Sequence, residues 1–279
     1  MMTERATGTE RATGTEPKMA RLALVWHEVR YSLLVMSRNR QARFFTLVLP
    51  VGLLVLFASI FGHQIFAIDG HSVAATTYYV GNLTAFGVLD GAFMTVIVVI
   101  VTERESGILK RRRATPEPAW AVVAGRAATA VVSTLGIVVL LLVVGWIGYS
   151  APIALGTLPA LGAGVMVGTL SACSLAFALS SLVTSADSAQ PFATAAALPL
   201  CFVSGVFIPW SIVPPWLRAV AEIFPVRQLA QLVLVPLEAR HGASGFDPVA
   251  LAVVAAWGVL GLLVASRRFS WQPRAGLSR

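Results

Sequence analysis

The side chains that usually bind phosphate or hold a catalytic metal form no complete set in this sequence. A phosphate-binding loop requires a Gly-Lys pair before Ser or Thr, but neither Lys18 nor Lys110 follows a glycine. His27 begins an H-E-x-x-H pattern, which is typical of a zinc site on a helix, but Tyr31 occupies the position of the second histidine. We therefore expect the chain to bind no cofactor and no metal through these motifs.

Candidate nucleophiles fail in the same way. Ser204 matches part of a motif of intramembrane serine proteases, but Phe202 stands where that motif requires glycine. Cys173 and Cys201 lie in apolar runs without the spacing of a disulfide framework or a zinc site. We interpret both cysteines as packing residues, and we predict that the chain alone is not an enzyme.

Charge is concentrated in one short segment between two apolar runs, Glu103–Arg126, which reads ERESGILKRRRATPEPAWAVVAGR. Gly107 allows the chain to turn, and the Thr-Pro pair further on ends any helix. Glu103 and Glu105 complement a helix N-terminus, and the four cations after Leu109 favour a helix C-terminus. The pattern predicts a short helix that starts at the acids; the alternative is an ordinary basic loop.

One acid, Asp90, lies well inside a long apolar run. Near-helical spacing places Asn82, Phe86 and Phe93 on the same side, and such a polar and aromatic stripe is a candidate substrate path. Alternatively, Asp90 hydrogen-bonds to a neighbouring helix, because the G-x-x-x-G pattern that begins at Gly87 marks close helix packing.

The elements that must position these residues are strongly apolar. The chain of 279 residues is 57% hydrophobic and 12% charged, with a mean hydropathy of +0.78, whereas soluble domains are about 25% charged. Six stretches approach the roughly 20 residues that cross a bilayer, which predicts an all-α integral membrane protein with six transmembrane helices. The predicted spans are Phe44–Phe66, Tyr79–Thr102, Ala127–Tyr149, Leu158–Val183, Pro191–Pro209 and Pro248–Ser266.

The basic residues predict the orientation of these spans. With six spans, 18 of the 21 Lys and Arg residues fall on one side of the membrane, and Arg218, Arg227 and Arg240 fall on the other. Positive residues are enriched on the cytoplasmic side, so both termini are expected there. The net charge of +8 is thereby assigned to cytoplasmic loops, and no nucleic-acid partner is expected.

The flanking segments are predicted from composition. Residues 1–18 repeat TERATG and are expected to be a disordered tail, so Met19 is a candidate start. Residues 19–43 carry apolar side chains at helical spacing among arginines, which predicts an amphipathic cytoplasmic helix at the membrane surface. The span region then covers 44–266, and 267–279 forms a cytoplasmic tail.

The charged segment resembles the first cytoplasmic loop of type-2 ABC transporter permeases, whose fold is shared with the G subfamily of exporters. The shared pattern is read from Glu103, Arg104, Glu105, Gly107, Leu109, Arg111, Ala114, Thr115, Pro116, Trp120, Gly125 and Arg126. In that family the segment is a coupling helix that docks on a separate ATPase subunit, so the resemblance assigns Glu103, Arg104, Glu105, Gly107, Leu109, Arg111, Thr115 and Pro116 to coupling. Arg112 and Arg113 replace the leucines usual in the family, which implies a more basic contact.

A second match follows the fifth predicted span, where four prolines interrupt any continuous helix. It resembles the family's signature for a short re-entrant hairpin on the outer side of the membrane. The matching positions are Ser204, Gly205, Pro209, Pro215, Trp216, Leu217 and Pro225. The adjacent Arg227-Gln228 pair departs from the small or aromatic residues usual there.

Together these matches imply the membrane permease subunit of an ABC exporter in the plasma or inner membrane of a bacterium. The resemblance implies that a partner subunit binds ATP and Mg, that a second permease completes a homo- or heterodimer, and that an amphipathic drug, antibiotic or lipid-like compound is expelled. The alternatives are export of a polysaccharide or glycolipid by the same family and, in another class, ion-coupled secondary transport. The latter predicts inverted repeats and several intramembrane charges.

Overall fold

A computed structural model describes residues 44–68, 70–108, 119–238 and 244–268, together with Trp26, Val29 and Arg30. The predicted disordered tail over 1–18, most of the predicted amphipathic helix over 19–43 and the tail after 268 lie outside the described residues. So do four predicted coupling residues, Leu109, Arg111, Thr115 and Pro116.

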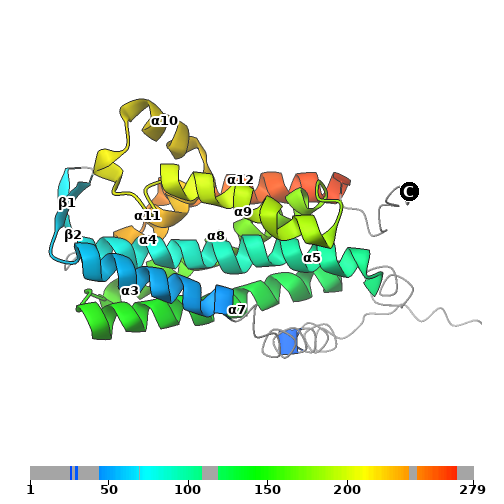
Figure 1. Ribbon diagram of the computed structural model, residues 1–279, viewed down its shortest axis with the longest axis horizontal. Coiled ribbons are helices and arrows are strands. Elements are labelled where there is room, and N and C mark those ends of the chain that lie inside the picture. The colour runs from blue at the N-terminus through cyan, green and yellow to red at the C-terminus, as the bar shows by residue number, and fades with distance from the viewer. Residues whose placement is uncertain are drawn as a thin grey trace, which may run out of the picture.

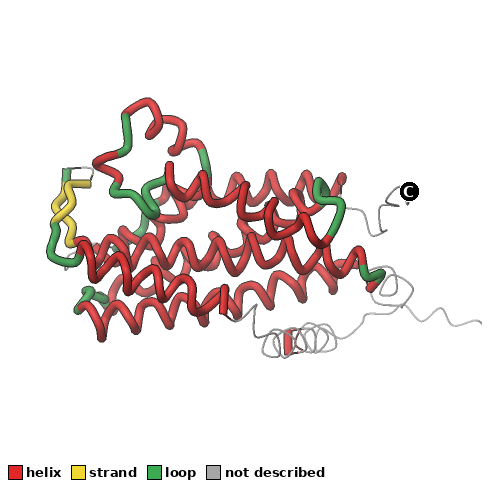
Figure 2. Tube along the Cα trace, in the orientation of Figure 1, coloured by secondary structure: helices red, strands yellow, loops and turns green. Residues whose placement is uncertain are grey.

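The described part of the chain is a bundle of helices that lie side by side along the long axis of the molecule (Figures 1 and 2). In chain order the helices are η1 (Phe44–Val48), α3 (Leu49–Phe61), α4 (Ala75–Leu89), η2 (Asp90–Met94), α5 (Thr95–Glu105), α7 (Ala119–Tyr149), η3 (Leu155–Thr157), α8 (Leu158–Ser180), α9 (Ala186–Val203), η4 (Trp210–Ile212), α10 (Pro215–Ile223), α11 (Pro225–Glu238) and α12 (Pro248–Arg268). Two of these, η1 and η2, are single π-helical turns that continue into α-helix.

Four described helices are long and apolar enough to cross a membrane: Ala75–Glu105, Val123–Tyr149, Leu155–Ser180 and Pro248–Arg267. The helices α10 and α11 form a fifth apolar unit, bent by 90° between Ile223 and Pro225. Two further predicted spans correspond to helices that are shorter or less apolar. Helix α3 has only 13 residues, and α9 carries the charged Asp187 in its first turn. The structure thus confirms a mostly helical, multi-pass membrane protein.

Two predicted span ends were wrong. The first predicted span continues to Phe66, but α3 ends at Phe61 and an antiparallel hairpin follows, made of β1 (Ile65–Ile68) and β2 (His71–Ala74). The hairpin turns through Gly70 at φ +83°, a conformation that favours glycine. Similarly, α9 ends at Val203 rather than Pro209, because Gly205 at φ +82° turns the chain out of the helix.

The continuous helix formed by α4, η2 and α5 is the centre of the bundle. Helices α3, α7 and α11 pack against its first half, and α8 and α9 pack against its second half. Close approach to α7 depends on glycine, because a Cβ atom at Gly87 would lie 2.7 Å from the Cγ2 atom of Ile137. The G-x-x-x-G pattern that begins at Gly87 therefore marks a face where two helices pack closely, as the packing interpretation of this segment expected.

Candidate functional site

The E-R-E run forms the last turn of α5, at the end of the bundle where α7 begins and α12 ends (Figure 1). The prediction that a helix starts at Glu103 was wrong, because the helical hydrogen bonds of the preceding apolar run continue through Glu105. The Ser106 amide donates to the Thr102 carbonyl at 2.9 Å, and Gly107 leaves the helix at φ +72°. The acids therefore lie at a helix C-terminus.

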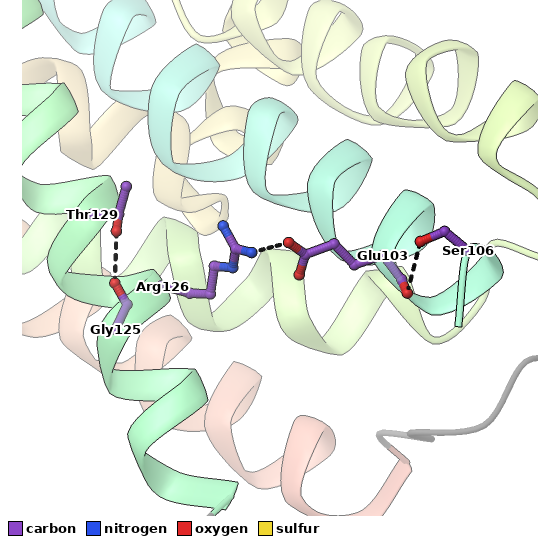
Figure 3. Close-up of polar contacts among 5 residues, drawn as sticks. All are labelled: Glu103, Ser106, Gly125, Arg126 and Thr129. Atoms are coloured by element: carbon purple, nitrogen blue, oxygen red, sulfur yellow. Dashed lines mark hydrogen bonds and ion pairs between the residues drawn. The ribbon is translucent and has the colours of Figure 1, made fainter. Parts of the chain in front are cut away.

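Glu103 faces the start of α7. Its carboxylate forms an ion pair with the Arg126 guanidinium, across the gap between the two helices in Figure 3. The Ser106 hydroxyl donates to the Glu103 carbonyl at 3.2 Å, which adds a bond within the end of α5. The pair brings together two residues of the predicted motif, 23 positions apart.

Arg104 faces the opposite side, towards the end of α8. Its side chain is only 2% exposed, and Nη1 donates to the carbonyl oxygen of Ser180 at 3.1 Å while Nη2 donates to that of Val183. The last carbonyls of a helix have no donor within the helix. A basic side chain satisfies them and also complements the negative end of the helix dipole. Arg104 thus caps α8.

Glu105 reaches the start of α9. Its carboxylate accepts a hydrogen bond from the Ala186 amide, the first N–H of that helix. The N-cap Ser185 hydroxyl accepts from the Ser188 amide at 3.4 Å, so two acceptors serve this terminus. Glu105 does complement a helix N-terminus, but the helix is α9, more than 80 residues along the chain.

These three contacts join the ends of α5, α7, α8 and α9. We call the set Glu103, Arg104, Glu105, Arg126, Ser180, Val183 and Ala186 the junction. The sequence singled out four of its members as motif residues but not their pairing with each other or with backbone atoms. The remaining three act through carbonyl and amide groups, which every residue type carries, so no spacing rule identifies them.

The predicted substrate-path residues are all buried within the chain. Asn82 donates to its own helix at the Tyr78 carbonyl, 2.9 Å away, and Phe86 meets the Phe207 ring at 5.2 Å. Asp90 begins the π-helical turn η2, and its Oδ2 atom has no hydrogen-bond partner among the described residues. Phe93 borders an apolar cavity. A substrate path through these four residues stays a prediction.

The predicted outer hairpin lies at the end of the bundle opposite the junction (Figure 1). Among its residues, Pro215 and Pro225 begin α10 and α11, Pro209 precedes η4, Trp216 is exposed, and Ser204 and Gly205 form the turn after α9.

A tyrosine attaches this turn to the bundle. The Tyr78 hydroxyl donates to the Gly205 carbonyl and accepts from the Trp210 amide at 3.1 Å. The Arg227 guanidinium lies 3.8 Å from the centre of the Trp210 ring, a cation–π contact. The start of α4, the turn after α9 and the start of α11 are thereby connected.

The family model described as ABC-2 type transporter matches residues 23–237. This chain belongs to the ABC-2 type transporter family. The match contains the whole junction and the whole predicted hairpin from Ser204 to Pro225, which confirms the resemblance to type-2 permeases. The protein is therefore a membrane permease component of an ABC transporter. No curated protein sequence matches the chain.

Proposed function

We propose that this permease exports an amphipathic compound, such as a drug, an antibiotic or a lipid-like molecule, using ATP that a separate subunit hydrolyses. The observation that supports the export machinery is the family match over 23–237 together with the junction that its charged motif forms. The ATP-binding subunit would hold ATP and Mg, and a second permease would complete the membrane pore.

In this proposal the chain crosses the bacterial inner membrane six times, with η1–α3 and α9 as the two shorter spans. Both termini and the junction lie in the cytoplasm, in keeping with the charge asymmetry of the loops. At the other surface, α10 and α11 form the re-entrant hairpin, since the 90° bend between them lies beside the middle of α12.

The junction supports a specific route for coupling. The segment after Gly107 would contact the ATP-binding subunit. A movement of this segment would then displace the end of α5. Glu103, Arg104 and Glu105 pass that displacement to α7, α8 and α9, because each makes a direct bond to one of these helix ends. In this proposal Glu103, Arg104 and Glu105 act within the chain, and residues after Gly107 contact the ATP-binding subunit.

Transport by inside-out vesicles tests this function. Vesicles that contain the chain and its ATP-binding subunit should accumulate an amphipathic fluorescent dye when ATP is added, and should not when ATP is replaced by a non-hydrolysable analogue. Collapse of the proton gradient should leave the initial rate unchanged. Uptake that requires the gradient but not the ATP-binding subunit would favour ion-coupled transport instead, and uptake of lipid-linked glycan but not dye would favour the polysaccharide alternative.

A further inference from the structure

A cavity of about 190 Å³ lies inside the bundle between α8, α9, α11 and α12, and Leu89 of α4 and Phe93 of η2 also line it. Its walls are almost entirely hydrocarbon. The apolar lining includes Leu175 and Leu179 of α8, Leu200 of α9, Leu229 of α11 and Val254 of α12. Small residues of α8 and α9 leave the space open. The cavity is separate from the junction and from the polar groups around Tyr78.

An aromatic pair forms part of the cavity wall. The rings of Phe224 and Trp257 stack with their centroids 6.1 Å apart and an angle of 19° between their planes. The Trp257 Nε1 atom donates to the Ile223 carbonyl at 2.8 Å, which fixes the indole against the bend between α10 and α11. Ser171, the polar side chain of the lining, donates to the Val254 carbonyl at 2.8 Å. These polar groups are therefore already bonded to the protein.

The cavity is at the depth of the bilayer centre. Trp257 is the tenth of 21 residues in α12, so it lies about 15 Å from either end of that helix. This is half of the roughly 30 Å thickness of the hydrocarbon layer. Helix α12 packs mainly on α8, whereas α9 packs mainly on α5. The half-exposed lining residues come from α8, α9, α12 and the bend, so the mouth opens sideways between α9 and α12.

Size and chemistry restrict what fits. An apolar cavity of about 150 Å³ in another protein stays dry and binds benzene, whereas sites for whole drug-sized ligands occupy roughly 300–1,000 Å³. A complete lipid tail spans one leaflet, about 15 Å, and exceeds a ring-sized space. The flat aromatic wall favours a ring. The polar groups of Ser171 and Trp257 already form hydrogen bonds within the protein, so a polar ligand would lose its hydration without gaining a hydrogen bond.

We infer that this cavity is a binding site for a ring-sized hydrocarbon group of a compound that is dissolved in the bilayer and enters between α9 and α12. The site discriminates by shape and apolarity alone. It does not depend on the proposed export function, because its walls come from one chain and need no ATP-binding subunit.

Quenching of Trp257 fluorescence by bromobenzene tests the site in the purified chain, reconstituted in lipid nanodiscs. The chain has seven tryptophans, so the Trp257 signal is taken as the difference between wild type and Trp257→Phe. We expect quenching that saturates, and that toluene reverses at least tenfold more effectively than phenol after correction for partition into lipid. Ala196→Phe, which fills the cavity, should weaken this binding at least tenfold. Ala195→Phe, an exposed neighbour on the same helix that does not line the cavity, should leave it unchanged.

Quenching that rises linearly with the bromobenzene in the membrane, and is equal in wild type, Ala196→Phe and Ala195→Phe, would overturn the proposal. The competition between toluene and phenol needs no variant, so the test remains decisive if Ala196→Phe does not fold. Nanodiscs made with tail-brominated lipids supply a second arm. Trp257 quenching by these lipids that Ala196→Phe removes and that toluene does not relieve would show that a lipid tail is the occupant, against the inference.

Discussion

Glu103 and Arg126 are mostly shielded from water, with side-chain exposures of 17% and 13%. An ion pair in such a position is screened little by salt, and removal of one charge leaves the other poorly compensated, at a cost of roughly 2–5 kcal/mol. The structure therefore gives both charges a partner within the chain. The resemblance alone assigned Glu103 to contact with the ATP-binding subunit, whereas its carboxylate binds a helix of its own chain.

A charge exchange separates these two roles at the residue scale. We expect Glu103→Arg and Arg126→Glu, each alone, to reduce dye transport at least tenfold, because two like charges then meet between α5 and α7. The double variant restores an ion pair of opposite polarity and should recover a substantial part of the transport rate at matched membrane expression. A double variant that inserts normally but is no more active than either single variant would mean that Glu103 acts on a partner subunit.

At the scale of elements, the end of α5 depends on one backbone conformation. Gly107 has φ +72°, and its amide donates to the Arg104 carbonyl at 3.2 Å, so it closes the helix directly after the junction residues. A side chain at this position has open space around it, which means that only backbone strain opposes a substitution. The direction in which the chain leaves α5 is therefore set by a glycine.

Gly107→Ala should lower the free energy of unfolding by about 1–2 kcal/mol, because an L-residue is disfavoured at this positive φ. Gly107→Pro should cost more, because proline fixes φ near −65° and removes the amide donor, and it should also abolish transport. Gly52→Ala is the matched control, since Gly52 lies inside α3 with open space at its Cβ position and alanine favours a helix. Thermal unfolding of the purified variants measures the difference. Equal melting temperatures for Gly107→Ala and Gly52→Ala would contradict the assigned role of the turn.

At the scale of the whole molecule, composition and periodicity predicted the long helices well. The second predicted span, Tyr79–Thr102, falls inside the continuous helix from Ala75 to Glu105. A long apolar run in a bilayer forms a helix because its backbone groups must hydrogen-bond within the segment. The hairpin over Ile65–Ala74 was not predicted, since its apolar residues continue the pattern of the preceding span. The junction was predicted only as a motif, because Arg104 and Glu105 bind backbone atoms that have no sequence signature.

The orientation of the whole bundle leads to a labelling prediction. Ser72 of β2 and Ser244 before α12 are exposed at the end opposite the junction, and Ser106 is exposed at the junction end. Ser72→Cys and Ser244→Cys should react with a membrane-impermeant maleimide in intact cells, whereas Ser106→Cys should react only after permeabilisation. The native Cys173 and Cys201 are buried, so background labelling should be low. Labelling of Ser106→Cys in intact cells would reverse the orientation.

We expect this permease to work only with a separate ATP-binding subunit, and the ATP hydrolysis rate of purified protein is the decisive measurement. The chain, isolated in nanodiscs free of other subunits, should hydrolyse no ATP, because its sequence lacks the Gly-Lys loop that holds phosphates. The chain purified together with its ATP-binding subunit should hydrolyse ATP, and replacement of the Walker A lysine of that subunit should abolish the activity. The Gly107→Pro variant of the chain should change the rate of the complex. ATP turnover by the chain alone would show that the permease does not need a separate ATP-binding subunit.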